Sequence, residues 1–221
     1  MGLIYLLSQD PSLFILIVIS LVFALCVHEF SHGIVAYLCG DDTAYNAGRL
    51  TLNPMNHLDP IGSILILIIG VGYAKPVPVN SFNLKNPRID MIKIAAAGPL
   101  SNFALSFLGA FFLVLFIKVN LLTADLMMFF RYFILINIYL GLFNLIPIHP
   151  LDGGQIFGNL ISKYNPNIFN QLRTRGPIVL FAIIFLGLIS GVSIIGLLIG
   201  YPAQLIFNFF LKIAELILFL L

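Results

Sequence analysis

The chain has 221 residues, of which 60% are hydrophobic and 9% are charged, and its mean hydropathy is +1.07. Soluble proteins carry roughly 25% charged residues, so this composition excludes an ordinary soluble domain. The formal net charge is only +2, with no basic stripe in the sequence, which argues against a nucleic-acid partner. Because a transmembrane helix needs about 20 apolar residues, we expect one all-α polytopic membrane domain over residues 1–221, with about five transmembrane helices.

The first long helix is predicted to begin at Asp10 and Pro11, an N-cap residue followed by a proline at the first helical position, and to stop at Gly40. At 1.5 Å per residue it would be about 43 Å long, more than the roughly 30 Å of hydrocarbon in a bilayer, so its last turns should reach the interface. The residues before it lack the positive charge and the cleavage site of a secretory signal peptide, so we expect no cleaved signal.

A polar stretch follows at residues 41–60 and is rich in Asn, Pro and Gly. It is predicted to be a loop with a short strand at residues 49–52. The next apolar run, residues 61–73, is only about 13 residues long, which is too short to span the bilayer. The alternating prolines of KPVPVN at residues 75–80 favour an extended backbone. We therefore expect residues 61–73 to form a re-entrant segment.

Four further helices follow in the prediction. A second long helix covers residues 89–117 and is interrupted by AAAGPLSN at residues 95–102. A third covers about residues 127–145. After a polar loop, two last spans are expected at about residues 177–199 and 202–221.

The positions of Lys and Arg indicate how these helices are oriented. If residues 61–73 are re-entrant, Lys118 and Arg131 fall on one side of the membrane and a larger basic group falls on the other. That larger group consists of Arg49, Lys75, Lys85, Arg88, Lys93, Lys163, Arg173 and Arg175. By the positive-inside rule, its side is cytoplasmic. We expect a multi-pass protein of the cell membrane with its amino terminus outside and its active site near the cytoplasmic side.

The motif HEFSH, from His28 to His32, lies inside the first apolar helix. His28 and His32 share one helix face, where both imidazoles can hold a zinc ion. Glu29 lies beside them, placed to act as a general base on water at the metal. The alternative, polar residues that merely line a helix interface, is disfavoured because ionisable groups at membrane depth are costly and mark functional sites.

A catalytic zinc usually has three protein ligands, so a third one is needed. Cys39 lies about 10 Å further along the helix axis, and Cys26 points to the opposite face. Glu215 is the only glutamate besides Glu29 and has no accompanying motif. The aspartates and the two remaining histidines, His57 and His149, stay as candidates.

Asp152 is the best of these candidates. It belongs to LDGG, whose two glycines permit a tight turn that could aim the carboxylate at the HEFSH helix. It also follows the third long helix, so it is predicted to lie near the same membrane boundary as HEFSH. A turn aspartate next to glycines would be the ordinary interpretation without HEFSH.

Three motifs give the chain a resemblance to the site-2 protease family of intramembrane zinc metalloproteases. They are HEFSH, AAAGPLSN at residues 95–102 and NLIPIHPLDGG at residues 144–154. NPMNHLDPIG at residues 53–62 and GYAKPVPVN at residues 72–80 are similar to the compact bacterial and archaeal branch, which has no PDZ-like domain.

The resemblance implies a zinc-dependent intramembrane endopeptidase with one Zn²⁺ per chain and a transmembrane protein as substrate, acting within the lipid bilayer. It implies a three-helix catalytic core at about residues 11–160 and two accessory helices at about residues 177–221. The cleavage would serve regulated intramembrane proteolysis or the clearance of membrane remnants.

The resemblance also implies roles for single residues. Zinc would be held by His28, His32 and Asp152, with Glu29 as general base. Asn144 would orient the substrate or stabilise developing negative charge. The segment expected to receive an unwound substrate strand by edge pairing consists of Lys75, Pro76, Val77, Pro78, Val79 and Asn80.

Three other polar residues receive separate interpretations. Asn102 is expected to be a helix-packing residue, and His149 is expected to be structural. His57 stays between two interpretations, a loop residue near the interface and a neighbour of the active site.

Two rival functions use the same motif. The HxxxH pattern also occurs in membrane di-iron oxygenases, but those sites need many more histidines than the four of this chain. A non-proteolytic zinc-binding membrane transporter or chaperone is the second rival. Glu29 argues against it, because such a site needs no general base.

Overall fold

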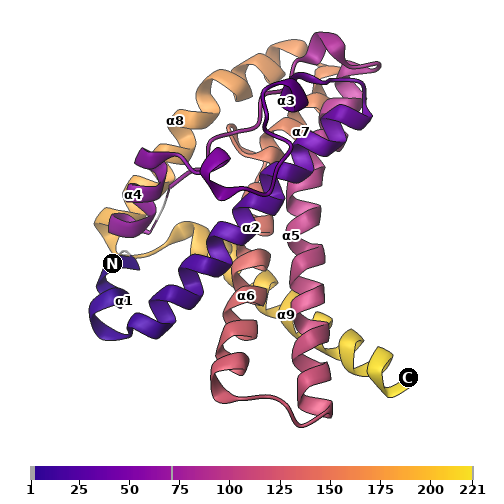
Figure 1. Ribbon diagram of the computed structural model, residues 1–221. Helices are drawn as coiled ribbons and strands as arrows, with labels where there is room; N and C mark the ends of the chain where they lie inside the picture. Colours follow the sequence, from indigo (N-terminus) through magenta and orange to yellow (C-terminus); the bar gives the residue numbers. More distant parts are fainter. Residues whose placement is uncertain (1–2, 71, 221) are drawn as a thin grey trace.

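The computed structural model describes residues 3–70 and 72–220, and within these residues it is helical and contains no strand (Figure 1). The helices long and apolar enough to cross a membrane are α2 (Pro11–Leu38), α5 (Pro87–Lys118), α6 (Ala124–Asn144), α8 (Pro166–Ser190) and α9 (Ile194–Leu220). The shorter elements are α1 (Leu3–Gln9), α3 (Thr43–Asn46), η1 (Pro54–Asn56), α4 (Pro60–Ile69), η2 (Ser81–Asn83) and α7 (Asp152–Ser162). The predicted all-α polytopic architecture is confirmed.

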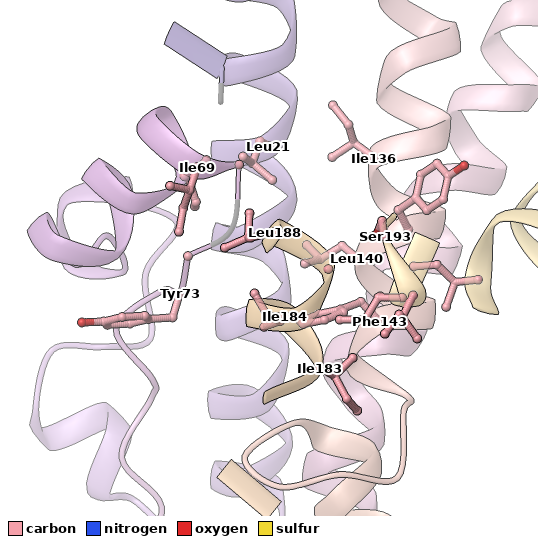
Figure 2. A pocket seen from close by; sticks show the side chains of 18 of the residues that line it. Leu21, Ile69, Tyr73, Ile136, Leu140, Phe143, Ile183, Ile184, Leu188 and Ser193 are labelled. Carbon is pink, nitrogen blue, oxygen red and sulfur yellow. The ribbon is translucent and has the colours of Figure 1, made fainter. Parts of the chain in front are cut away.

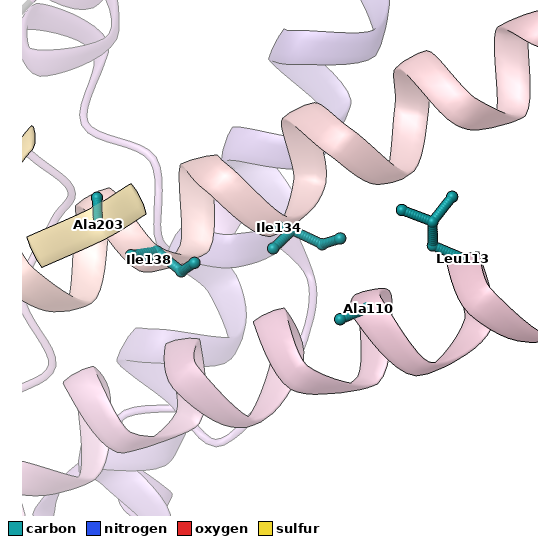
Figure 3. Close-up of a cluster of buried hydrophobic side chains, with 5 residues drawn as sticks. All are labelled: Ala110, Leu113, Ile134, Ile138 and Ala203. Carbon is teal, nitrogen blue, oxygen red and sulfur yellow. The ribbon is translucent and has the colours of Figure 1, made fainter. Parts of the chain in front are cut away.

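The centre of the bundle is formed by α5 together with α2, α6 and α9. In Figure 1, α5 and α6 run side by side and are joined by a short loop. Their contact is apolar and continues onto α9 through the buried side chains Ala110, Leu113, Ile134, Ile138 and Ala203 (Figure 3). Gly109 lies at this contact, where a Cβ atom would sit 2.9 Å from the ring of Phe133. Small residues allow such close approach of helices in a bilayer.

The first long helix has the predicted ends. The Asp10 carboxylate accepts a hydrogen bond from the backbone N–H of Leu13 at 3.0 Å, which satisfies one of the free donors of the first turn. The chain leaves α2 at Gly40, whose φ of +105° is accessible to glycine at low cost.

The segment predicted to be re-entrant, residues 61–73, folds back in its described parts, residues 61–70 and 72–73, and residue 71 lies outside the described residues. Asp59 caps α4, and Gly70 ends it in the left-handed conformation. Leu58 forms an antiparallel bridge with Ala74, so the chain leaves and returns at the same place. The two arms approach closely at Gly62, where a Cβ atom would overlap the carbonyl oxygen of Tyr73. This geometry agrees with a segment that does not cross the membrane.

Two local expectations are wrong. AAAGPLSN does not interrupt a helix, because α5 is continuous from Pro87 to Lys118 with Pro99 inside it. Proline removes one helical hydrogen bond, and packing on several sides compensates this in a buried transmembrane helix. Residues 49–52 form no strand, because Leu50 and Thr51 lie in a bend and the residues on either side of them have no regular structure. The Thr51 carbonyl accepts from the His57 ring at 2.6 Å, so a side-chain contact replaces strand pairing.

The ends of the last two helices also differ from the prediction. α8 begins at Pro166, where Asn165 caps the first turn, and the two helices are separated by a short turn that starts at Gly191. Pro177 and Pro202 lie inside helices and do not start them. The first of these two helices therefore starts before residue 177, because hydrogen-bonding caps decide where a helix begins.

Candidate metal centre

Three ionisable side chains from two distant parts of the chain meet where α2, α5 and α7 pack together. His28 and His32 project from α2, and Asp152 is the first residue of α7. The Nε2 atom of His28 lies 3.1 Å from one Asp152 oxygen, and the Nε2 atom of His32 lies 3.4 Å from the other. One ligand atom from each residue lies within 4.8 Å of the others, which is the arrangement of a metal-binding group.

The glycines of LDGG explain how Asp152 reaches α2. A Cβ atom on Gly153 would overlap the carbonyl oxygen of Leu145, and one on Gly154 would lie 2.5 Å from the backbone nitrogen of His149. Only glycine therefore allows the start of α7 to pack against the chain that leaves α6. The carboxylate of Asp152 is placed at the amino-terminal end of α7, where the helix dipole favours negative charge.

Both histidines are oriented through their Nδ1 atoms. His28 Nδ1 lies 2.6 Å from the Asn102 side-chain oxygen, and His32 Nδ1 lies 2.7 Å from the Ile94 carbonyl oxygen. An oxygen of this kind can only accept, so each Nδ1 carries a hydrogen, and the neutral form of each ring then presents its lone pair at Nε2. This is the orientation that metal-ligating histidines adopt when a second group fixes the ring.

The donor set fits a zinc ion. Two imidazole Nε2 atoms and a carboxylate converge in a buried place, and a cation between them would balance the carboxylate charge and accept the lone pairs of the neutral rings. Two histidines and one carboxylate are a known ligand set of catalytic zinc, which keeps a fourth position open. Gly98 on α5 provides room for this group, because a Cβ atom there would lie 2.5 Å from His32 Nε2 and 2.6 Å from His28 Nε2.

Asn102 connects the centre to the core of the bundle. Its side-chain nitrogen donates to Asn137 Oδ1 at 3.1 Å and to the Ala24 carbonyl at 3.3 Å. Asn137 donates in turn to the Phe133 carbonyl at 2.9 Å. Asn102 and Asn137 are fully buried, so this chain of hydrogen bonds ties α2, α5 and α6 together behind His28.

Neither Gly98 nor Asn102 was predicted to take part in the metal site. Asn102 was interpreted as a packing residue, and it does link helices, but it also contacts a metal-ligand candidate directly. Both residues belong to AAAGPLSN. The pattern that could have indicated their role is a glycine and an amide close together inside an apolar helix. Small residues permit close approach of helices, and polar residues at membrane depth are commonly functional.

A cavity of about 400 Å³ opens onto this centre. The ligand candidates line it together with Glu29 and Asn144. Glu29 Oε2 accepts a hydrogen bond from the backbone N–H of Val77 at 3.0 Å. Asn144 is the last residue of α6, and its side-chain nitrogen donates to the Leu140 carbonyl at 3.0 Å.

The predicted substrate segment contributes to the cavity only in part. Pro76, Val77 and Val79 line it. Lys75, Pro78 and Asn80 do not line it. Instead, the backbone of Lys75 bonds to His57 and Arg49, and the backbone N–H of Asn80 donates to Asp41.

Neither remaining histidine joins the metal-binding group. His57 is fully buried, with its Nε2 atom 2.6 Å from the Thr51 carbonyl, and it does not line the cavity. His149 packs against Phe169, with ring centroids 6.4 Å apart. Burial and the nearby Arg173 lower the pKa of His149.

A second cavity of about 580 Å³ adjoins the first (Figure 2). The two cavities share the lining residues Leu25, Gly72, Tyr73, Leu140 and Phe143. Figure 2 shows that apolar side chains from α2, α4, α6 and α8 surround the second cavity, among them Leu21, Ile69, Ile136, Ile184 and Leu188. A largely apolar space thus leads directly to the metal-binding group.

Comparison with known proteins gives one consistent result. The family model of peptidase family M50 matches residues 15–124 and 114–190.

Three of the relatives carry the description "putative zinc metalloprotease". YwhC of Bacillus subtilis (strain 168) is 43% identical over 174 residues, which are 76% of this chain and 79% of YwhC. MJ0611 of Methanocaldococcus jannaschii is 32% identical over 142 residues, which are 64% of this chain and 66% of the relative. Rip2 of Mycobacterium tuberculosis (strain H37Rv) is 28% identical over 180 residues, which are 78% of this chain and 65% of Rip2. No solved structure matches the chain.

Proposed function

Because the chain belongs to peptidase family M50, the site-2 protease family of zinc metalloproteases, we propose that it is an intramembrane endopeptidase that cleaves transmembrane segments of other membrane proteins. A metalloendopeptidase activity and a multi-pass membrane location follow from the family and from the five apolar helices. The single observation that carries the finer proposal is the convergence of His28, His32, Asp152 and Glu29 at one cavity between those helices. The activity would serve regulated intramembrane proteolysis or the clearance of membrane remnants.

We assign one zinc ion per chain to the Nε2 atoms of His28 and His32 and to the carboxylate of Asp152. When bound, zinc supplies Lewis-acid chemistry: it polarises the scissile carbonyl and lowers the pKa of a coordinated water to about 7. The hydrogen bonds from the two Nδ1 atoms support the assignment, because they place the hydrogen of each neutral ring on Nδ1 and leave the Nε2 lone pair for a metal.

Glu29 is the proposed general base. The N–H of Val77 holds its Oε2 atom, so Oε1 is the oxygen that takes the proton from the attacking water and passes it to the leaving amine. A positioned carboxylate of this kind contributes roughly 10²- to 10⁴-fold to the rate. Its place among the residues that line the cavity supports this role.

Asn144 and the extended segment are the proposed substrate-binding groups. Asn144 borders the same cavity as Glu29, so its amide can contact the scissile peptide. Pro76, Val77 and Val79 would receive the unwound substrate strand by backbone pairing. The adjoining apolar cavity suits the apolar side chains of a transmembrane substrate.

We also propose that the active site lies near the cytoplasmic side and that the amino terminus is external. The basic residues that follow α2 support this orientation through the positive-inside rule. The antiparallel bridge of Leu58 with Ala74 supports it too, because it keeps Arg49 and Lys75 on one side of the membrane, where the Arg49 side chain donates to the Lys75 carbonyl at 2.7 Å.

The test is the Glu29→Gln variant in reconstituted vesicles that contain a transmembrane substrate. It should bind zinc as the wild type does and lose cleavage by roughly 100-fold or more, because the amide cannot accept the proton. Glu215→Gln is the matched control, since Glu215 is exposed on α9 and does not line the cavity. Cleavage by Glu29→Gln at the wild-type rate would contradict the mechanism. Zinc transport into the vesicles without peptide cleavage would favour the transporter alternative.

A further inference from the structure

We infer that Arg49 and Asp41 clamp the two ends of the segment at residues 75–80 and thereby position Glu29. The inference rests on the proposed function, in which Glu29 is the general base. Arg49 and Asp41 are positioning residues, because neither lines the cavity or contacts the metal-binding group. They act through one hydrogen bond, from the Val77 N–H to Glu29 Oε2.

The first end of the segment is held at Lys75. The Arg49 guanidinium donates to the Lys75 carbonyl at 2.7 Å, and the Lys75 N–H donates to the His57 carbonyl at 2.8 Å. Arg49 is 8% exposed and has no carboxylate within ion-pair distance in the part of the chain that the structure describes. Burying a guanidinium without a counter-ion is costly. We therefore expect the charge-assisted hydrogen bond from Arg49 to the Lys75 carbonyl to have a specific role.

The other end of the segment is held at Asn80. The Asn80 N–H donates to Asp41 Oδ2 at 2.7 Å. Asp41 is fully buried directly after α2, and its other oxygen accepts from the Thr43 backbone N–H at 3.1 Å and from the Asn83 side chain at 2.9 Å. The carboxylate is therefore fixed by several donors and gives the segment a rigid anchor.

The segment between the two anchors is stiff. Pro76 and Pro78 fix φ and carry no N–H, so Val77 is the one donor between them. With Lys75 and Asn80 tied, the Val77 N–H is directed at Glu29. Gly33 lies one turn after Glu29 on the same face of α2, where a Cβ atom would be 3.3 Å from the Val77 side chain and 2.7 Å from Leu50. The glycine lets the segment and the loop that carries Arg49 approach α2 together.

The clamp is separate from the groups that hold the metal ligands. His28 and His32 are oriented by Asn102 and Ile94 on α5, and none of these residues touches Arg49 or Asp41 by a hydrogen bond in the described part of the chain. Loss of the clamp should therefore disturb the base and leave zinc binding intact. Such a result would distinguish positioning of Glu29 from a general loss of structure.

The experiment compares Arg49→Met, which keeps the length of the side chain without the donor, with Arg49→Lys, which keeps a charged donor. In vesicles with a transmembrane substrate, Arg49→Met should lower kcat roughly 10- to 100-fold, as a small misplacement of a catalytic group does, with KM and zinc content unchanged. Arg49→Lys should recover most of the loss. Arg88→Met is the matched control, because Arg88 is exposed at the start of α5.

Hydrogen exchange of the full-length protein provides the second measurement and does not depend on peptidase activity. Arg49→Met should raise the exchange rate of the 75–80 peptide at least roughly tenfold and leave a peptide that covers HEFSH unchanged. Unchanged exchange of the 75–80 peptide would overturn the clamp, as would raised exchange with full kcat. A wild-type protein that binds zinc without cleaving would refute the proposed function, while the exchange result would still decide whether Arg49 holds the segment.

Discussion

Replacing Asn102 with Leu should weaken zinc binding, although Asn102 is not one of the three proposed ligands. Leu has nearly the same shape, but it cannot accept the hydrogen bond from His28 Nδ1, which spans 2.6 Å. Loss of a group that hydrogen-bonds a metal-ligating histidine typically lowers metal affinity 10- to 100-fold, which corresponds to about 1.4–2.7 kcal/mol. A buried donor left without an acceptor costs about 1–3 kcal/mol, so the two estimates agree.

The measurement is a zinc titration of purified protein in detergent against a competing chelator at constant pH. Asn137→Leu is the control, because it removes the acceptor for the Asn102 side-chain nitrogen at 3.1 Å and leaves the contact with His28 in place. We expect this control to weaken zinc binding less than roughly tenfold. If folded Asn102→Leu binds zinc with a Kd within about twofold of wild type, the loss of affinity is far smaller than the roughly 10- to 100-fold expected. That result would refute the argument that Asn102 fixes the His28 ring.

Three further predictions follow from the site and its surroundings. Asp152→Asn should lower the zinc content of the purified protein, because a neutral amide is a weaker ligand than a carboxylate; unchanged zinc occupancy would point to a different third ligand. Gly98→Ala should reduce zinc content and cleavage together, since its Cβ atom would lie 2.5 Å from His32 Nε2, whereas Gly200→Ala places a Cβ atom in open space and should leave both unchanged. Burial raises the pKa of Asp41, but hydrogen bonds from its neighbours outweigh burial and bring this pKa below the ordinary value. The ionised Asp41 carboxylate therefore stabilises the folded protein above about pH 4, and this stabilisation is lost as the pH falls through the lowered pKa. Thermal unfolding should accordingly lose less stability on acidification in Asp41→Asn than in wild type, and parallel curves would contradict this assignment.

Local patterns in the sequence were sufficient to predict the long apolar helices and to place His28 and His32 together on one helix face. Hydropathy over about 20 residues predicts a span wherever it lies in the fold, and the spacing of His28 and His32 places them on one face of any helix. LDGG made Asp152 the best candidate for the third ligand, and the structure brings its carboxylate to both histidines. The predicted boundaries of the last two helices were wrong, because the predicted spans began at Pro177 and Pro202. In the structure, Asn165 and Gly191 cap the two ends of α8.

The sequence by itself determined a polytopic helical membrane protein with a zinc motif in its first long helix, because hydropathy and helical spacing act over short distances along the chain. Only the tertiary structure decided how that motif is supported. Asn102 reaches His28 across 74 residues, the Val77 N–H reaches Glu29 across 48, and the Asn80 N–H reaches Asp41 across 39. Such contacts depend on where whole helices pack, and no local pattern specifies which polar group will face another after folding.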